Sequence, residues 1–323
     1  MLFVSSGTER GPYPALEIAI FRALKEQVKA IMYRQGYLVD TVLSTNPDLV
    51  LIFHGIYRHK FDALSKDISS IRKLGFKTAI WLTDDPYYSS TTKALCLQYD
   101  YVFTQDRGSV SFYKECGAKK VFFLPLATDP KAYRPLEVNP AYQSDICFIG
   151  VAFDNRLQFI DSIADYLSTK NVKLIGPKWN QLNHYSRLKE KIILGKWLKP
   201  KDTARYYNGA KIVLNLHRLD ADKKINKNKH NIPAFSINNR TFEILSCKTF
   251  QLTDMRPDLE QFYTPQQEIE TFNSADLFIK KAEYYLKHHE ERNQVAIDGY
   301  RKTLQENTYD KRIQSLLKHV RNS

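Results

Sequence analysis

The sequence predicts an α/β protein with two parallel-sheet domains in succession. Short apolar runs alternate with helical patterns along most of the 323 residues, which is typical of βαβ units. Four prolines crowd into one stretch, where neither a helix nor a central strand tolerates them; they are Pro125, Pro130, Pro135 and Pro140. We therefore predict one domain at 1–140 and a second at 141–308.

All but the edge strands predicted in the first domain are continuously apolar, as expected of strands that helices cover on both faces. We expect them at 2–5, 48–53, 77–82, 101–104 and 120–124. After the first strand, Phe21, Leu24, Val28 and Ile31 recur at helical spacing. This spacing predicts an amphipathic helix that ends near Gly36.

The alternation restarts after the prolines. Strands are expected at 146–150, 172–175, 211–216 and 249–252, and helices at 156–167 and 241–247. From Ser274 onward the pattern is helical only, and a last helix begins at Tyr309. The stretch 220–230 carries four lysines and almost no apolar residue, so we predict a mobile basic loop there.

The composition excludes several classes of protein. With 43% hydrophobic and 26% charged residues the chain is not intrinsically disordered, and no apolar stretch approaches the roughly 18 to 20 residues that span a bilayer. The four cysteines form no CxxC pair, so neither a disulfide framework nor a structural zinc site is indicated. Together with an N-terminus unlike a signal peptide, these features predict a soluble cytoplasmic protein.

Positive charge dominates the sequence. The 48 lysines and arginines exceed the 35 acidic residues, which gives a net charge of +13. Such a surplus attracts anions: nucleic acid, acidic lipid headgroups, a polyanionic polymer or the diphosphate of a nucleotide. Charge alone does not choose among these partners.

Ligands of open parallel sheets bind outside the carboxyl ends of the strands, so polar residues that follow the apolar runs are the candidates. In the first domain this rule selects the loop with Gly7 and Gly11, then His54, and then Asp84 and Asp85. An aspartate there could act as a general base or orient a substrate hydroxyl. The alternatives are structural: His54 as a buried strand-end side chain, and the aspartates as a helix N-cap before a proline. Adjacent side chains diverge and no third ligand is visible, so no metal site is expected.

In the second domain the same rule selects residues on three segments. Gly150 ends a strand and Arg156 opens the next helix, so backbone N–H groups and a guanidinium could meet a phosphate. Residues 215–218 follow another strand. Glu243 is expected in the exposed first turn of a short helix, where a carboxylate could bind a ligand or simply pair with the helix dipole.

One segment resembles a known family. Residues 237–254, INNRTFEILSCKTFQLTD, are similar to the signature of the CgeB-like (spore-maturation) glycosyltransferases. Further pieces agree with this resemblance: WLTDDP at 81–86, LPLATDP at 124–130, ICFIG at 146–150 and RPDL at 256–259. The resemblance covers nearly the whole chain and is most specific in the second half.

The resemblance implies a GT-B fold, in which two Rossmann-like domains face a central cleft and a last helix, 309–323, packs back on the first domain. The second domain would hold a nucleotide-diphosphate sugar, with Glu243 on its ribose hydroxyls. The implied donor-binding residues are Gly150, Arg156, Arg218, Asn239, Arg240 and Glu243. The first domain would face the acceptor through the loop of Gly7 and Gly11, with catalytic candidates Asp84, Asp85 and His54.

Three positions depart from the wider superfamily pattern. A second glutamate would stand at Phe235, a glycine at Lys248 and an arginine at Val151. The resemblance therefore implies that Arg240, Arg218 or the basic loop neutralises the diphosphate. Neither a metal nor another cofactor is expected, because enzymes of this type stabilise the leaving diphosphate with cationic side chains and helix N-termini.

We expect a metal-independent glycosyltransferase whose acceptor is a glycan, a cell-envelope or spore-surface polymer, or a protein. Peripheral contact with an anionic membrane and association with the spore are left open. Two alternatives also stay open: a catalytically inactive structural or coat protein with this fold, and a polyanion- or nucleic-acid-binding protein. No nucleic-acid-binding module is present, which argues against a specific nucleic-acid partner.

Overall fold

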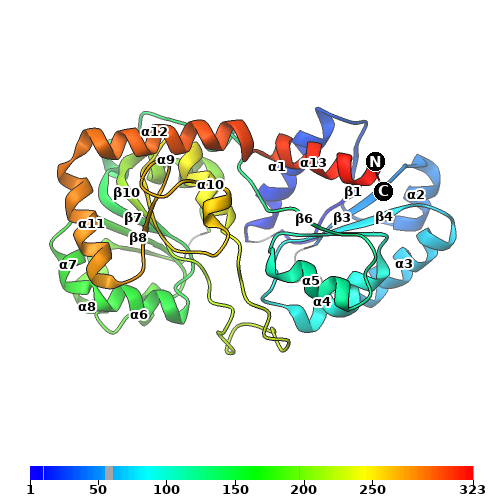
Figure 1. The fold of residues 1–323 in the computed structure, drawn as a ribbon, viewed down its shortest axis with the longest axis horizontal. Helices are drawn as coiled ribbons and strands as arrows, with labels where there is room; N and C mark the ends of the chain where they lie inside the picture. Colours follow the sequence, from blue (N-terminus) through cyan, green and yellow to red (C-terminus); the bar gives the residue numbers. More distant parts are fainter. Residues whose placement is uncertain (10, 55–60, 196, 323) are drawn as a thin grey trace. The chain divides into compact units, whose positions relative to one another are not determined.

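The computed structural model describes residues 1–9, 11–54, 61–195 and 197–322, which form two compact units (Figure 1). Unit 1 comprises Met1–Leu126, Asp220–Ser236 and Tyr309–Ser323, and unit 2 comprises Ala127–Leu219 and Ile237–Thr308. In the described part of the chain each unit contains one parallel sheet of six strands. The predicted α/β class with two parallel sheets is confirmed.

The sheet of unit 1 has the order β2-β1-β3-β4-β5-β6. Its strands are β1 (Leu2–Val4), β2 (Ile31–Tyr33), β3 (Val50–His54), β4 (Thr78–Leu82), β5 (Tyr101–Thr104) and β6 (Val121–Phe123). Its helices are α1 (Tyr13–Lys25), α2 (Leu38–Thr45), α3 (Phe61–Lys73), α4 (Ser89–Leu95), α5 (Gly108–Glu115) and α13 (Tyr309–Arg321).

Successive strand residues of unit 1 enter two different cores. Leu2 and Val4 pack on the face covered by α2, α3 and α5. Phe3 points to the other face, where its ring stacks on Phe21 of α1 at 6.2 Å. The C-terminal helix α13 lies beside α1, as Figure 1 shows in red and blue. The predicted return of the last helix to the first domain is therefore confirmed.

One predicted helix is wrong in its extent. Helix α1 ends at Lys25, and Ile31 belongs to the edge strand β2. The apolar spacing that continues through Val28 and Ile31 thus spans a helix and the next strand. Periodicity alone does not separate a helix end from a short edge strand.

Unit 2 has the sheet order β12-β11-β10-β7-β8-β9. Its strands are β7 (Ser144–Ile149), β8 (Val172–Gly176), β9 (Ile192–Leu194), β10 (Ala210–Asn215), β11 (Gln251–Asp254) and β12 (Glu270–Phe272). Its helices are α6 (Asp154–Ser162), α7 (Ala164–Ser168), α8 (Tyr185–Leu188), α9 (Pro200–Gly209), α10 (Asn239–Ser246), α11 (Ala275–Lys287) and α12 (His289–Glu306).

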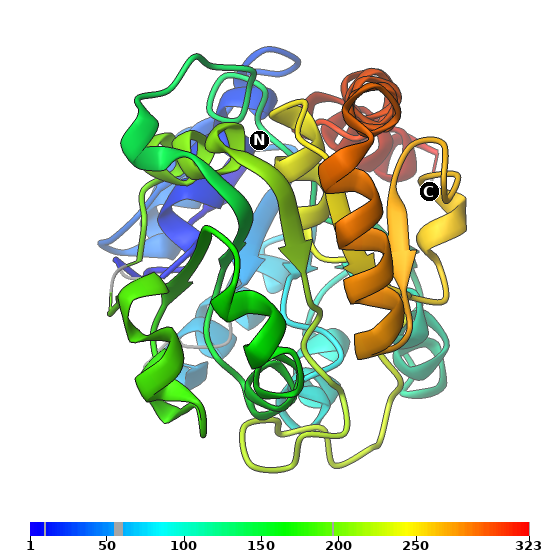
Figure 2. The same cartoon turned by 90° about the vertical axis from the view of Figure 1, so that its left-hand side faces the viewer.

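Helices cover both faces of the unit 2 sheet. Ile146 and Phe148 of β7 face α6, α7 and α11, whereas Cys147 faces α9 and α10. Figure 2 shows α11, in orange, running along the sheet. None of the helices in the described ranges is long and apolar enough to cross a membrane.

Each sheet has one point where the strand order reverses. In unit 2 the chain leaves β7 toward β8 and β9 and then returns to β10 on the other side of β7. In unit 1 the same reversal lies between β1 and β3. Ligands of doubly wound sheets bind outside the carboxyl ends of the strands at such switch points, so these two places are the candidate sites.

The division of the chain differs from the predicted ranges. Unit 1 ends at Leu126, at the start of the proline-rich stretch, whereas the sequence placed the boundary at residue 140. The basic segment 220–236 also belongs to unit 1. Its backbone N–H groups at Phe235 and Ser236 donate to Asp106 Oδ2 at 3.0 and 2.9 Å, and Ser89 Oγ donates to Asn228 at 2.7 Å. Only the stretch 220–230 was predicted to be a mobile loop, and it too has partners in unit 1: besides the contact of Asn228, the Lys227 backbone N–H donates to Tyr87 O at 2.8 Å.

Lys248 stands where the wider superfamily pattern has a glycine. The backbone conformation at Lys248 explains why a glycine suits this position. Helix α10 ends at Ser246 with Cys247 as C-cap, and Lys248 follows with φ 58°. A residue with a Cβ is strained in this left-handed region, which glycine adopts freely. Lysine at this position therefore carries a backbone strain that glycine would avoid.

We predict that Lys248→Gly raises the free energy of unfolding by about 0.5 to 1 kcal/mol, because it relieves the left-handed strain. Urea denaturation followed by tryptophan fluorescence measures the change. Lys280→Gly is the control: Lys280 is exposed inside helix α11, where glycine should cost about 1 kcal/mol. A loss of stability in Lys248→Gly contradicts the prediction.

Candidate functional site

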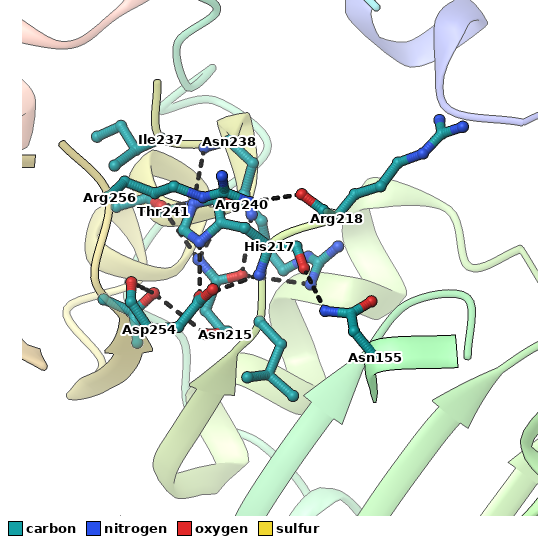
Figure 3. Close-up of polar contacts among 12 residues, drawn as sticks. Asn155, Asn215, His217, Arg218, Ile237, Asn238, Arg240, Thr241, Asp254 and Arg256 are labelled. Carbon is teal, nitrogen blue, oxygen red and sulfur yellow. Dashed lines mark hydrogen bonds and ion pairs between the residues drawn. The ribbon is translucent and has the colours of Figure 1, made fainter. Parts of the chain in front are cut away.

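The candidate site of unit 2 lies at the switch point between β7 and β10. Gly150 directly follows β7, Asn215 is the last residue of β10, and α10 begins at Asn239. Figure 3 shows Asn215 close to Asn238, the N-cap of α10. Parallel pairing of Cys147 with Val213 brings the two strand ends to the same edge of the sheet.

Gly150 lies in a crowded place. A Cβ on Gly176, at the end of β8, would come within 2.2 Å of the Gly150 carbonyl oxygen, and Gly176 itself has φ +140°. A Cβ on Gly150 would lie 3.1 Å from Arg240 Nη2 and 3.3 Å from Arg156 Nη1. The glycines therefore allow two arginines to approach the end of β7.

Arg156 is buried, and its guanidinium is directed at backbone carbonyls. Its Nε and Nη2 donate to Leu216 O at 3.1 and 2.7 Å, and its Nη1 donates to Val151 O at 2.8 Å. Only 3% of its surface is exposed. This arrangement favours a structural role, joining the loops that follow β7 and β10, over the phosphate contact that the sequence predicted.

Two half-buried arginines provide positive charge at the site. The Arg240 guanidinium lies 5.3 Å from the centre of the Phe148 ring, and its Nη1 donates to Asn215 Oδ1 at 3.3 Å. The Arg218 guanidinium lies 5.2 Å from the centre of the Phe153 ring. Stacking on an aromatic ring orients a guanidinium and leaves edge donors for an anion.

A pair of side-chain amides fixes the beginning of α10. Asn238 is the N-cap, and its Oδ1 accepts from the Thr241 backbone N–H at 3.0 Å. Asn238 and Asn215 also exchange two amide hydrogen bonds, of 3.1 and 3.2 Å. The capped end of α10 is thus tied to the end of β10, as Figure 3 shows.

His217, which follows β10, connects the end of β11 with the beginning of α10. Its Nδ1 lies 2.6 Å from Asp254 Oδ1 at the end of β11, and its Nε2 accepts from the Asn238 backbone N–H at 3.1 Å. Burial lowers the pKa of His217, although Asp254 acts in the opposite direction. Burial alone would raise the pKa of Asp254, but the contacts with His217 hold it below its usual range.

Glu243 differs from the sequence-based expectation. The helix begins at Asn239, earlier than predicted, so Glu243 lies in the second turn and is only 8% exposed. Asn239 Nδ2 donates to Glu243 Oε1 at 2.7 Å, which joins two of the predicted donor-binding residues. Burial raises the pKa of Glu243 to about 7, despite the opposing effects of Asn239, Arg240 and Tyr133. The prediction of an exposed first-turn carboxylate is therefore wrong.

In unit 1 the two adjacent aspartates diverge. Asp85 is buried and accepts from Thr104 Oγ1 at 2.6 Å and from the Tyr113 hydroxyl at 2.5 Å. Burial raises its pKa to about 6. Asp84 is half-buried and accepts from the Tyr13 hydroxyl. Because α4 begins only at Ser89, the helix-capping interpretation of both acids is wrong.

The remaining candidates of unit 1 lie at its switch point. Gly7 and Gly11 follow β1 with φ 74° and 75°, so both adopt a conformation that favours glycine. Between β1 and α1, the Ser6 backbone N–H donates to the buried Glu17 carboxylate at 2.6 Å. His54 is the last residue of β3, and its side chain lies outside the described residues.

Sequence reasoning missed His217, Asp254, Asn215 and Asn238 as members of one network. The strand-end rule did select Asn215 and His217, within 215–218. It could also have selected Asp254, which follows the strand predicted at 249–252, and Asn238 precedes a predicted helix. Their mutual contacts depend on the strand order, which the sequence did not provide. Across the described ranges, no three His, Cys, Asp or Glu side chains gather in a way that could hold a metal ion.

The structure resembles solved glycosyltransferase structures over nearly its full length. Anabaena HepE in complex with UDP-glucose aligns with a TM-score of 0.66 and 11% identity, covering 100% of this chain and 99% of that one. Sucrose-phosphate synthase from Thermosynechococcus elongatus aligns with a TM-score of 0.65 and 10% identity, covering 99% and 98%. These likenesses show that the chain has the GT-B fold. At identities this low they show the fold alone.

Sequence comparison identifies the family. The model of the family described as "Glycosyl transferase-like" matches residues 156–318, half of the chain. The spore protein CgeB of Bacillus subtilis (strain 168) is 31% identical over 233 residues, which are 72% of this chain and 71% of that protein. The resemblance stated from the sequence is confirmed: the chain belongs to the CgeB-like glycosyltransferases of the glycosyl transferase-like family.

Proposed function

We propose that this protein transfers a sugar from a nucleoside-diphosphate donor to an acceptor hydroxyl without the help of a metal ion. The observation that carries the proposal is the position of Arg240. Its guanidinium lies beside Gly150, at the switch point of unit 2, on the first turn of α10. A helix N-terminus and a guanidinium together favour the binding of a diphosphate.

The leaving group explains the need for this charge. Breaking the bond between sugar and diphosphate places negative charge on the nucleoside diphosphate, and fixed cations that meet this charge lower the barrier. Arg240 and Arg218 would supply it, each already oriented by an aromatic ring. Arg156 would act indirectly by holding the loops after β7 and β10 together.

Glu243 and Asn239 would bind the ribose. The Glu243 carboxylate is buried and accepts a hydrogen bond from Asn239 Nδ2. Two ribose hydroxyls offer further donors, and hydrogen bonds to a carboxylate are stronger than those between neutral groups. Donor binding would therefore favour the ionised form of Glu243.

The solved relatives support the choice of donor. HepE of Anabaena holds UDP-glucose, so uridine diphosphate is the first nucleotide to test. The acceptor would be a glycan, an envelope or spore-surface polymer, or a protein, and the likeness to a spore protein favours the spore surface. The net charge of +13 would also permit peripheral contact with an anionic membrane.

On the acceptor side, Asp84 is the better candidate for a general base. Asp85 has both carboxylate oxygens committed to Thr104 and Tyr113 inside unit 1. Asp84 is only half-buried, follows the carboxyl end of β4 and bonds to Tyr13. The loop of Gly7 and Gly11, together with His54, would complete the acceptor site at the switch point of unit 1.

The donor proposal predicts that a nucleoside diphosphate binds and stabilises the protein by about 2.7 kcal/mol at 100 times its Kd. Calorimetry and thermal shift with UDP, GDP, dTDP and ADP measure this effect. Excess EDTA should leave the Kd unchanged, because Arg240 and Arg218 provide the charge. A requirement for Mg²⁺ would overturn the assignment to these arginines, and no binding at all would favour an inactive protein.

Glu243→Gln should weaken nucleotide binding about tenfold, and Glu243→Ala should weaken it further, because the first keeps one acceptor and the second keeps none. The affinity of the unmodified protein should fall as the pH falls through about 7, where Glu243 takes up a proton. Glu243→Gln should lack the part of this dependence that lies near pH 7. Glu260→Gln, an exposed change of the same kind in unit 2, is the control. Equal affinities in all variants would remove Glu243 from the site.

The two aspartates should respond differently. Asp84→Asn should lower kcat at least about tenfold and leave the Kd of the nucleotide unchanged, as expected for a base on the acceptor side. Asp85→Ala leaves two buried hydroxyls without their acceptor and should destabilise the protein by about 2 to 4 kcal/mol. Steady-state kinetics and thermal denaturation separate the two effects. Full turnover in Asp84→Asn would exclude Asp84 as the base.

A further inference from the structure

His217 lies where three elements of unit 2 meet, and only 2% of it is exposed. It follows β10, its Nδ1 lies 2.6 Å from Asp254 at the end of β11, and its Nε2 faces the N-cap of α10 (Figure 3). The Asp254 carboxylate also accepts from the His217 backbone N–H at 3.0 Å. The imidazole therefore has a partner at each ring nitrogen.

These contacts define one protonation state of the ring. A backbone N–H can only donate, so Nε2 must present its lone pair to Asn238. The ring proton then lies on Nδ1 and is donated to Asp254. A second proton would turn Nε2 into a donor that points at the donor of Asn238, and this contact would become repulsive.

Asn238 links the protonation state of His217 to the first turn of α10. Asn238 caps α10 through Thr241 and is followed directly by Asn239 and Arg240. Displacing the Asn238 backbone would therefore move the first turn of α10, which carries the guanidinium next to Gly150.

We infer that His217 is a positioning residue, which as a neutral imidazole with its proton on Nδ1 holds the first turn of α10 in the arrangement that binds the donor diphosphate. The inference rests on the proposed function, since it assigns a role within the same donor site. The charged groups that face His217 are Asp254 from β11, Arg256 beyond β11 and Arg240 from α10. The two arginines oppose protonation of the ring, and Asp254 favours it.

His217→Leu and His217→Gln separate positioning from mere packing. Leucine fills space without either hydrogen bond, whereas the glutamine amide offers one donor and one acceptor at a spacing similar to that of the ring nitrogens. We expect His217→Leu to weaken UDP binding at least about tenfold by calorimetry, and His217→Gln to restore it to within about threefold.

A second histidine provides a matched control in the same unit. His184 has its backbone N–H and its Nδ1 at 2.9 and 3.1 Å from Asp161 Oδ1, the same pattern as His217 with Asp254. It is half-exposed and bonds to α6, away from α10. His184→Leu should therefore leave the Kd for UDP within about twofold of its original value.

The pH dependence tests the protonation state. Glu243 also takes up a proton as the pH falls, so both proteins compared carry Glu243→Gln, which removes that titration. The single variant Glu243→Gln is compared with the double variant Glu243→Gln/His217→Gln from about pH 8 to about pH 5. The affinity for UDP should fall on the acid side in the first protein and stay level in the second. Histidine ¹⁵N spectra should show, at neutral pH, a neutral ring protonated on Nδ1 that disappears in His217→Gln.

The outcomes are distinguishable. Undiminished UDP binding by folded His217→Leu, an acid loss that persists in the double variant, or a ring protonated on Nε2 would each overturn the inference alone. If His217→Leu does not fold, His217→Gln and the pH profiles still decide. Absence of binding to UDP, GDP, dTDP and ADP by the unmodified protein would overturn the proposed function, and this inference with it.

Discussion

The parallel pairing of β7 with β10 is the constraint on which the candidate donor site depends. Register between Ile146 and Ile212 places the carboxyl ends of both strands at one edge, although more than 50 residues separate them in the sequence. The chain leaves this edge in opposite directions, and Arg156 joins the two loops through the carbonyls of Val151 and Leu216. Gly150 and the first turn of α10 can therefore act on one ligand.

A dense network of polar side chains surrounds this edge. Because its members hydrogen-bond to one another, the network is rigid. Asn215, His217, Asn238, Thr241 and Asp254 bond to one another with few alternatives. A buried donor or acceptor that loses its partner costs about 1 to 3 kcal/mol, so such a network has one strongly favoured arrangement. That property suits a site that must hold Arg240 in place before any ligand arrives.

The first turn of α10 carries a basic side chain and the second turn carries an acidic one. The Arg240 guanidinium lies over the Phe148 ring in the first turn, whereas burial raises the pKa of Glu243, one turn later, to about 7. Both residues lie on one short helix, so in the proposed donor site a shift of its first turn would alter the contacts of both with a nucleotide.

The sequence by itself determined the fold class and the family. Apolar runs without alternation specify strands covered on both faces, and the segment 237–254 carries the family resemblance, because both signals are local. The tertiary structure alone decided which side chains meet. It buried Glu243, turned Arg156 toward carbonyls, separated Asp84 from Asp85 and joined His217 to Asn238. Strand order and side-chain burial arise from contacts between distant segments, and no local pattern records them.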